Sequence, residues 1–335
     1  MRGSLKALGA ALLLLGGIGA AVATDAAAAE GDNAAGAAAG VKLLRRGTPH
    51  DALFDIAFEG PRGIAVGAFG SVLATGDGGA SWAPQALPST ANLALLSVAM
   101  RNGRCILVGQ SGQVFTADDC KSWKLSAPVT QSRLLAVGVN AQGVAYAVGG
   151  FGTILRSADW GRTWAPQNVD WKGFTSDGAE PHLYAVHVAA DGAPTVVGEF
   201  ELILRAGPDG KQWKALHKGQ RSLFGLTMLD DGRAFAVGQS GAVLASSDGG
   251  ANWRSLATGT EAILTGVHAS PDGPLLASGI NTVLVSRDQG VSWKRLSAKA
   301  IAQGRHQALA AGTAADGKPR LLVVGSGGSI LQIDP

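Results

Sequence analysis

Six tryptophans stand at nearly equal intervals along this chain, and their spacing constrains the fold more than any other feature. They are separated by 41, 41, 49, 40 and 40 residues, and each ends a turn-forming octet. Four of the six octets read S/T-x-D-x-G-x-x-W. A fixed period near forty indicates stacked supersecondary units. The six positions are Trp82, Trp123, Trp164, Trp213, Trp253 and Trp293.

A second marker, a glycine turn after a short apolar run, occurs seven times. It starts at Gly67, Gly109, Gly149, Gly198, Gly238, Gly279 and Gly325. Within one unit, residues 223–256 read as four short strands joined by tight turns. Turns every eight to ten residues argue against a helical repeat of similar period. The pattern predicts an all-β fold, a seven-bladed β-propeller of four-stranded blades.

Six tryptophan turns against seven glycine turns indicate that the last unit lacks its fourth strand. Residues 41–46, a short apolar and basic run before the first unit, could supply it. We expect this run to pair with residues 329–333 and to close the ring without a covalent bond, so that neither sheet edge stays open.

The amino-terminal residues indicate export. Arg2 and Lys6 precede an apolar stretch over 8–20, followed by small residues to Ala23, which is the layout of a cleaved secretory signal peptide. We expect residues 1–23 to be removed, 24–40 to form a flexible Ala/Gly leader, and 41–335 to form the propeller. No later segment is long and apolar enough to span a membrane. The protein is thus expected to be a soluble monomer, periplasmic or secreted.

The tryptophan octet resembles the Asp-box of sialidase-like and related propellers. Its aspartate and hydroxyl oxygens can accept hydrogen bonds from their own turn, and its tryptophan can pack under the hairpin. The aspartates expected to do this are Asp77, Asp118, Asp159, Asp248 and Asp288. One carboxylate per turn is a weak calcium site, so we expect no metal and no cofactor.

The chain has two cysteines, Cys105 and Cys120, both in the second unit. In an oxidising compartment they could form a disulfide. Hairpin register places Cys105 nearer Thr116 than Cys120, so two buried free thiols are an equal alternative.

The glycine turns and the connections between blades should share one face, opposite the Asp-boxes, and we predict that a partner binds there. Phe69, Phe151 and Phe200 occupy matching turns, with Glu199 beside the last. They would form an apolar rim if exposed, and would pack between blades otherwise.

Other candidates for contact lie on this same face. The longest connection between blades, residues 165–182, carries Trp171 and Phe174, and either contacts a partner or covers a blade edge. Arg133, Arg221 and Arg305 precede innermost strands and could contribute to an electropositive patch.

The charge of the chain bears on its partners and chemistry. A formal net charge of +3 without a basic run argues against nucleic acid as a partner.

An enzyme of the sialidase type would need a tyrosine nucleophile, for which Tyr184 is the candidate, with Glu199 or Glu201 as carboxylate. Both glutamates belong to one turn, a poor arrangement for attack from opposite faces. Glycan binding or hydrolysis is therefore the alternative function.

The repeated run L-x-x-V/L, D-G, A-V-G-x-x-G-x-V/I-L and S-x-D-G-G-x-x-W over residues 41–335 resembles the Ycf48/HCF136-type family of propellers. That family includes factors that assist photosystem II assembly and many relatives in non-photosynthetic bacteria. The resemblance implies a non-catalytic scaffold that binds a protein partner, such as an assembly or accessory factor for envelope complexes or transporters. Photosynthetic members have an arginine-rich patch on one blade face. Here the innermost strand over 223–229 has no arginine, so a role in photosystem assembly is not expected.

Overall fold

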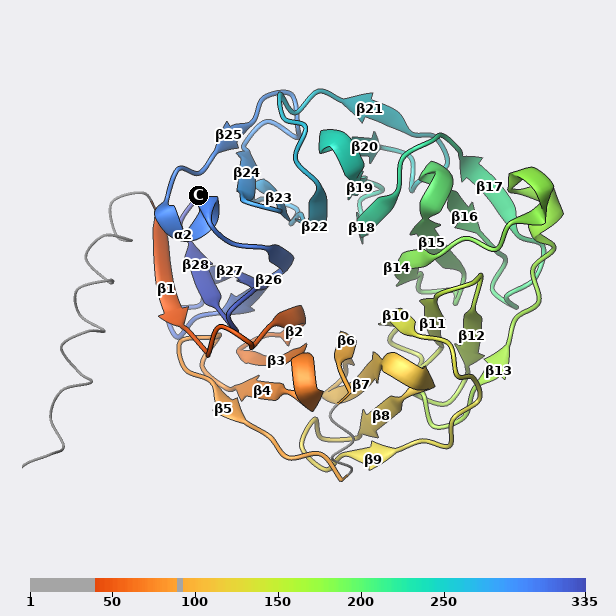
Figure 1. The fold of residues 1–335 in the computed structure, drawn as a ribbon, viewed down its shortest axis with the longest axis horizontal. Helices are drawn as coiled ribbons and strands as arrows, with labels where there is room; N and C mark the ends of the chain where they lie inside the picture. The colour runs from red at the N-terminus through yellow and green to blue at the C-terminus, as the bar shows by residue number, and fades with distance from the viewer. Residues whose placement is uncertain (1–39, 89–92) are drawn as a thin grey trace, which may run out of the picture.

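The computed structural model describes residues 40–88 and 93–335, which form seven four-stranded antiparallel sheets around a central axis (Figure 1). The predicted seven-bladed β-propeller is confirmed. The predicted signal peptide (1–23) and the leader (24–40), apart from residue 40, lie outside the described residues. No helix of the described part is long and apolar enough to cross a membrane.

The strands of blades 1–6 run outward from the axis in chain order, and the seventh blade differs only in that its outermost strand is β1; we number the blades from the first complete one. The innermost strands are β2 (Leu53–Glu59), β6 (Leu95–Arg101), β10 (Leu134–Val139), β14 (Leu183–Val188), β18 (Leu223–Met228), β22 (Leu264–His268) and β26 (His306–Thr313). The second strands are β3 (Arg62–Gly67), β7 (Arg104–Gly109), β11 (Ala145–Gly149), β15 (Pro194–Gly198), β19 (Ala234–Gly238), β23 (Leu275–Gly279) and β27 (Pro319–Gly325). The third strands are β4 (Val72–Thr75), β8 (Val114–Ala117), β12 (Ile154–Ser157), β16 (Ile203–Arg205), β20 (Val243–Ser246), β24 (Thr282–Ser286) and β28 (Ile330–Ile333). The outermost strands are β5 (Ala83–Pro84), β9 (Lys124–Leu125), β13 (Ala165–Pro166), β17 (Lys214–His217), β21 (Arg254–Leu256), β25 (Lys294–Arg295) and β1 (Val41–Arg45).

The hydrophobic core lies between neighbouring blades rather than at the axis. Every residue of β11 and of β19 is buried, because each second strand is covered on both faces. These strands therefore read as continuous apolar runs without alternation. One cluster joins Val66 of blade 1 to Leu107 of blade 2. The two faces of the ring, which carry the turns, are therefore the surfaces available for contact with other molecules.

The ring closes as expected. β1 pairs antiparallel with β28, with Val41 opposite Ile333 and Leu43 opposite Leu331. In Figure 1 the two strands lie side by side, so the seventh blade contains both ends of the described chain. Val41 is buried in the cluster that fills the space between blades 6 and 7.

The Asp-box turns are held by their own side chains. In blade 5, Asp248 accepts hydrogen bonds from the backbone N–H of Asn252 (2.9 Å) and from its side-chain amide (2.7 Å). These bonds lower the pKa of Asp248 well below its usual value. Ser246 accepts from the N–H of Gly250, and the indole N–H of Trp253 donates to the carbonyl of Gly250. The turns at Asp77, Asp159 and Asp288 repeat the aspartate and hydroxyl bonds.

The second Asp-box corrects one prediction. Asp119, not Asp118, accepts the turn's hydrogen bonds, from the backbone N–H of Ser122 (2.7 Å) and from its hydroxyl (2.7 Å). Asp118 instead accepts from Arg162 of the next blade's turn (2.6 Å). The physical reason is that this octet has two adjacent aspartates, and the ion pairs with Arg162 and Arg104 hold Asp118 away from the turn.

Cys105 and Cys120 form a disulfide, with Cα atoms 5.0 Å apart. Of the two alternatives, the structure shows the bridge. Cys120 has a φ of 55°, the left-handed conformation that glycine adopts in the regular turns. The disulfide therefore ties β7 to a turn that lacks its usual residue.

The two faces of the ring are distinct, as the hairpin order predicts. On one face, each Asp-box turn lies beside the first-to-second turn of its blade, and Gly249 donates to the carbonyl of Gly232 (2.8 Å). On the other, each glycine turn contacts the connection between blades, and Ala68 donates to the carbonyl of Ala52 (2.9 Å). We call them the Asp-box face and the glycine-turn face.

Candidate interaction face

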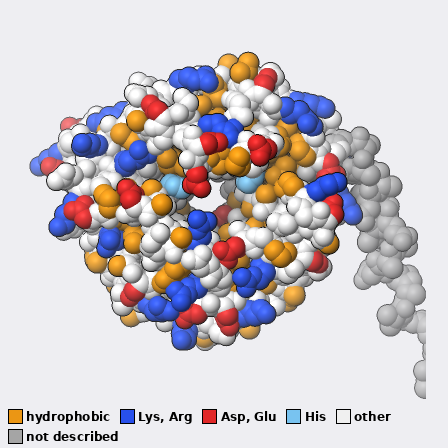
Figure 2. All heavy atoms as spheres, turned by 180° about the vertical axis from the view of Figure 1, so that it is seen from behind, with side chains coloured by type: hydrophobic (Ala, Val, Ile, Leu, Met, Phe, Trp, Pro, Cys, Tyr) orange, Lys and Arg blue, Asp and Glu red, His pale blue; other side chains and the backbone are white. Residues whose placement is uncertain are grey.

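Three phenylalanines stand exposed on the glycine-turn face. The exposed fractions are 62% for Phe69, 70% for Phe151 and 41% for Phe200. Of the two arrangements open from the sequence, the exposed rim is the one observed. Figure 2 shows the Asp-box face, where acidic and basic side chains are interspersed around the central opening.

The backbone of these phenylalanines is in an unfavourable conformation. Their φ angles are 55°, 54° and 61°, in the left-handed region, which costs an L-residue about 1–2 kcal/mol. The same position of the other turns holds residues that adopt this conformation more easily or are smaller, namely Ser111, Ser240, Asn281 and Gly327. A bulky aromatic residue with strained backbone and an exposed side chain contributes little to the stability of the fold. These phenylalanines therefore point to contact with another molecule.

The turn of Phe151 is fixed from outside by the long connection. Its short 3-10 helix η4 (Trp171–Gly173) places the Trp171 indole against Gly152, where an added Cβ would lie 2.4 Å from the indole nitrogen. Trp171 is only 7% exposed and packs with Leu183. Of the two roles that the sequence leaves open for Trp171, its burial favours covering the edge of the blade over contact with a partner. Phe174 is half-buried, with its ring 6.4 Å from that of Trp171.

The turn of Phe200 is fixed by an ion pair. Glu201, which is 7% exposed, lies 2.6 Å from the guanidinium of Arg221. Glu201 also has a positive φ, 46°, at a position where five other turns have glycine. Glu199 accepts a hydrogen bond from the N–H of His182 (2.8 Å). Arg221 and both glutamates thus hold the turn that presents Phe200.

The predicted arginine patch does not form as one cluster. Arg133, Arg221 and Arg305 precede the innermost strands of blades 3, 5 and 7, so the ring separates them. Arg221 is neutralised by Glu201, whereas Arg133 and Arg305 are exposed. Within the part of the chain that the structure describes, no ion pair involves Arg133 or Arg305. Arg133 and Arg305 are therefore available to bind acidic groups of a partner.

The sequence did not reveal a ring of side chains at the mouth of the central channel. Every innermost strand has a β-bulge after its first paired residue, which leaves the next residue unpaired. These seven residues, which we call the mouth ring, are Phe54, Leu96, Leu135, Tyr184, Phe224, Thr265 and Gln307. They line a cavity of about 240 Å³ at the axis. In the sequence, each of these residues stands directly before the position that holds a small residue in six of the seven innermost strands. Strand register inferred from the sequence does not show that a bulge turns this preceding residue toward the channel.

An aromatic series connects the rim to the mouth ring. Phe151 lies edge-on to His182 with ring centroids 5.1 Å apart, and His182 lies 6.3 Å from Tyr184. Tyr184 in turn is 4.9 Å from Phe224 of the next blade. Blades 3, 4 and 5 therefore present a continuous aromatic surface from the edge of the face to the axis.

The arrangement does not favour a glycosidase. Burial raises the pKa of the Tyr184 hydroxyl, and the charge of Glu199 raises it further, which is the opposite of what a nucleophile needs. The other tyrosine, Tyr146, is fully buried and out of reach of a substrate. Glu201 forms an ion pair with Arg221. Among residues 40–88 and 93–335, no group of three or more His, Cys, Asp or Glu side chains could hold a metal ion.

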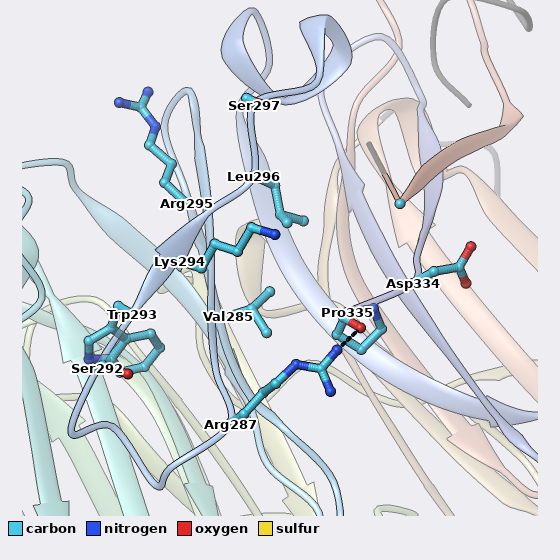
Figure 3. A pocket seen from close by; sticks show the side chains of 11 residues that line it. Val285, Arg287, Ser292, Trp293, Lys294, Arg295, Leu296, Ser297, Asp334 and Pro335 are labelled. Carbon is cyan, nitrogen blue, oxygen red and sulfur yellow. Dashed lines mark hydrogen bonds between the residues drawn. The ribbon is translucent and has the colours of Figure 1, made fainter. Parts of the chain in front are cut away.

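Another cavity lies at the seam between blades 6 and 7. It has a volume of about 600 Å³ and is lined by Arg287, Lys294 and the last two residues, Asp334 and Pro335 (Figure 3). Arg287 donates a hydrogen bond to the carbonyl of Pro335. This cavity is formed by the elements that close the ring, and it lacks the exposed aromatic residues of the glycine-turn face.

Comparisons with known proteins agree with this architecture. Residues 117–279 match the family model described as photosynthesis system II assembly factor YCF48. Among curated protein sequences, none matches significantly.

Solved structures share the fold. One titled "YCF48 bound to D1 peptide" is 18% identical, with a TM-score of 0.69, covering 88% of this chain and 97% of its own. YCF48 from Cyanidioschyzon merolae is also 18% identical, with a TM-score of 0.67 and coverages of 89% and 99%. The WD40 propeller domain of Doa1 is 14% identical, with a TM-score of 0.66 and coverages of 88% and 97%. At these identities, the solved structures establish the fold alone. The chain is therefore a seven-bladed β-propeller that, from its second blade to its sixth, is similar to the Ycf48 family.

Proposed function

We propose that this protein is a non-catalytic binding scaffold that takes a segment of a partner protein on its glycine-turn face. The observation that carries the proposal is the set of three exposed phenylalanines held in left-handed backbone at matching turns. Two of these turns are fixed by other elements, by Trp171 and by the pair of Glu201 with Arg221. Such preorganisation lowers the cost of ordering the face on binding.

The family match and the relative solved with a bound peptide support this class of function. We further propose that the protein acts in the periplasm or outside the cell, as an assembly or accessory factor for envelope protein complexes or transporters. The support for this location is the layout of residues 1–23. Mass spectrometry of the protein recovered from its host tests it, since export predicts a chain that begins near residue 24. A chain that retains Met1 would contradict it.

Site-specific photocrosslinking tests the interaction face. A benzoylphenylalanine is placed in turn at Phe69, Phe151 and Phe200, in cells that express the protein. The matched control is Val291, an Asp-box turn residue that is 78% exposed on the opposite face. We expect a discrete crosslinked protein band from the three rim positions and none from position 291. Equal crosslinking from position 291, or none from the rim, would refute this face.

A further inference from the structure

An acidic side chain lies in the wall of the central channel, directly below the mouth ring. It is Asp55, at a position of β2 where the other six innermost strands have small uncharged residues. Those residues are Ser97, Ala136, Ala185, Gly225, Gly266 and Ala308. Asp55 lines the same 240 Å³ cavity as the ring.

The carboxylate of Asp55 meets only neutral donors. One oxygen accepts hydrogen bonds from the Ser97 hydroxyl (2.7 Å) and the N–H of Val98 (2.9 Å), and the other accepts from the N–H of Ile56 (2.8 Å). No ion pair within the described residues includes Asp55. Burial raises the pKa of Asp55. Asp55 is half-buried in the wall of the cavity, and a partly desolvated carboxylate without a countercharge favours the binding of a cation.

The walls above Asp55 suit a cation as well. Phe54, Tyr184 and Phe224 contribute three aromatic rings to the mouth ring, and a cation over an aromatic face is stabilised, more so when it is desolvated. The seven positions of the mouth ring contain no basic residue.

We propose that the mouth of the central channel binds a cationic side chain, arginine or lysine, of the partner segment. This inference rests on the proposed function of the glycine-turn face. A wholly apolar side chain would bury the carboxylate further without a partner, and an acidic one would be repelled. Arg133 and Arg305 lie on the same face but are exposed to solvent, where their charge is screened, whereas Asp55 is in the cavity wall.

The experiment begins with a random peptide library displayed on phage and selected on the purified protein. We expect the selected peptides to share one arginine or lysine. A synthetic copy of the best arginine-containing binder is then compared with the same peptide carrying citrulline, a neutral analogue of similar shape. The affinity should fall at least tenfold on this exchange.

Two variants of the protein take their replacement from another blade of this same chain. Asp55→Ser introduces the residue found at the equivalent position 97, whose hydroxyl accepts from the N–H of Val137. Phe224→Leu introduces the residue found at positions 96 and 135. For Asp55→Ser, the exchange of arginine for citrulline should change affinity less than twofold, and for Phe224→Leu the arginine peptide should bind at least threefold more weakly.

The outcomes separate this inference from the function on which it rests. Selected peptides without a basic residue, or equal citrulline sensitivity in Asp55→Ser and the unaltered protein, would overturn the cation site. The proposed face would still stand if Phe69→Asn and Phe151→Asn then weakened binding of those peptides. Peptides whose binding ignores both rim substitutions would overturn the face itself.

Discussion

Replacing Phe151 with asparagine should separate stability from binding. The left-handed backbone at φ 54° costs a bulky residue about 1–2 kcal/mol, and asparagine adopts it more readily. About 30% of the phenylalanine surface is buried, since 70% is exposed. For an aromatic side chain this corresponds to roughly 60 Å², or about 1.5 kcal/mol, of which asparagine keeps about half.

The edge-on contact of Phe151 with His182 adds about 0.5 kcal/mol to what is lost. The gain and the losses therefore nearly offset, and we expect the free energy of unfolding to change by less than about 0.5 kcal/mol. Urea unfolding followed by tryptophan fluorescence measures it. Leu183→Ala, at a fully buried position of the next blade, is the control and should lose about 2–5 kcal/mol.

Binding should respond differently to Phe151→Asn. A central aromatic contact is worth about 2 kcal/mol or more at an interface, so affinity for a selected peptide should fall about 30-fold. A stability loss above about 1.5 kcal/mol would show that Phe151 is a packing residue. Unchanged affinity at unchanged stability would show that the rim does not touch the partner. Either result refutes the reasoning.

Three further predictions concern stability. Replacing Cys105 and Cys120 with alanine removes a crosslink over 15 residues and should cost about 3 kcal/mol in urea unfolding; an unchanged midpoint would contradict this. Deleting residues 41–46 uncovers the edge of β28 and should give aggregates in light scattering, whereas a monomer of equal stability would contradict the seam. Burial lowers the pKa of His268 in the folded protein to about 4. Between pH 6.5 and 4, this histidine is therefore protonated in the unfolded chain but neutral in the folded one. The free energy of unfolding should therefore fall by roughly 2–3 kcal/mol from pH 7.5 to 4.5 on account of this group, and His268→Ala should remove that part of the fall; an equal fall in the variant would refute the assignment.

The fold could be predicted because each blade repeats two independent turn signals. Glycine turns and Asp-boxes have local causes, such as the hydrogen bonds of Asp248 and the positive φ of Gly250. The mismatch of seven against six then predicted a closing strand within residues 41–46, and the structure shows it at Val41–Arg45. These features depend on chain neighbours or on counting, so they can be read without knowing the packing.

The site was less accessible to prediction because it depends on contacts between blades. Trp171 reads as a loop aromatic, and only the packing against Gly152 and Leu183 shows that it is a buried support. Asp118 occupies the motif position, but Arg162 of the next blade and Arg104 engage it, and Asp119 accepts the turn's bonds instead. The mouth ring arises from bulges, which shift side-chain direction by one residue, and the varied residues before the repeated small position do not by themselves show where a bulge lies.

Hydrogen–deuterium exchange with and without a selected peptide tests the binding face most directly. The bound peptide should slow exchange in the turns that start at Gly67, Gly149 and Gly198 and in the first residues of β14 and β18. Exchange in the Asp-box turns should stay unchanged. Protection confined to the Asp-box turns or to the seam between blades 6 and 7 would contradict the account.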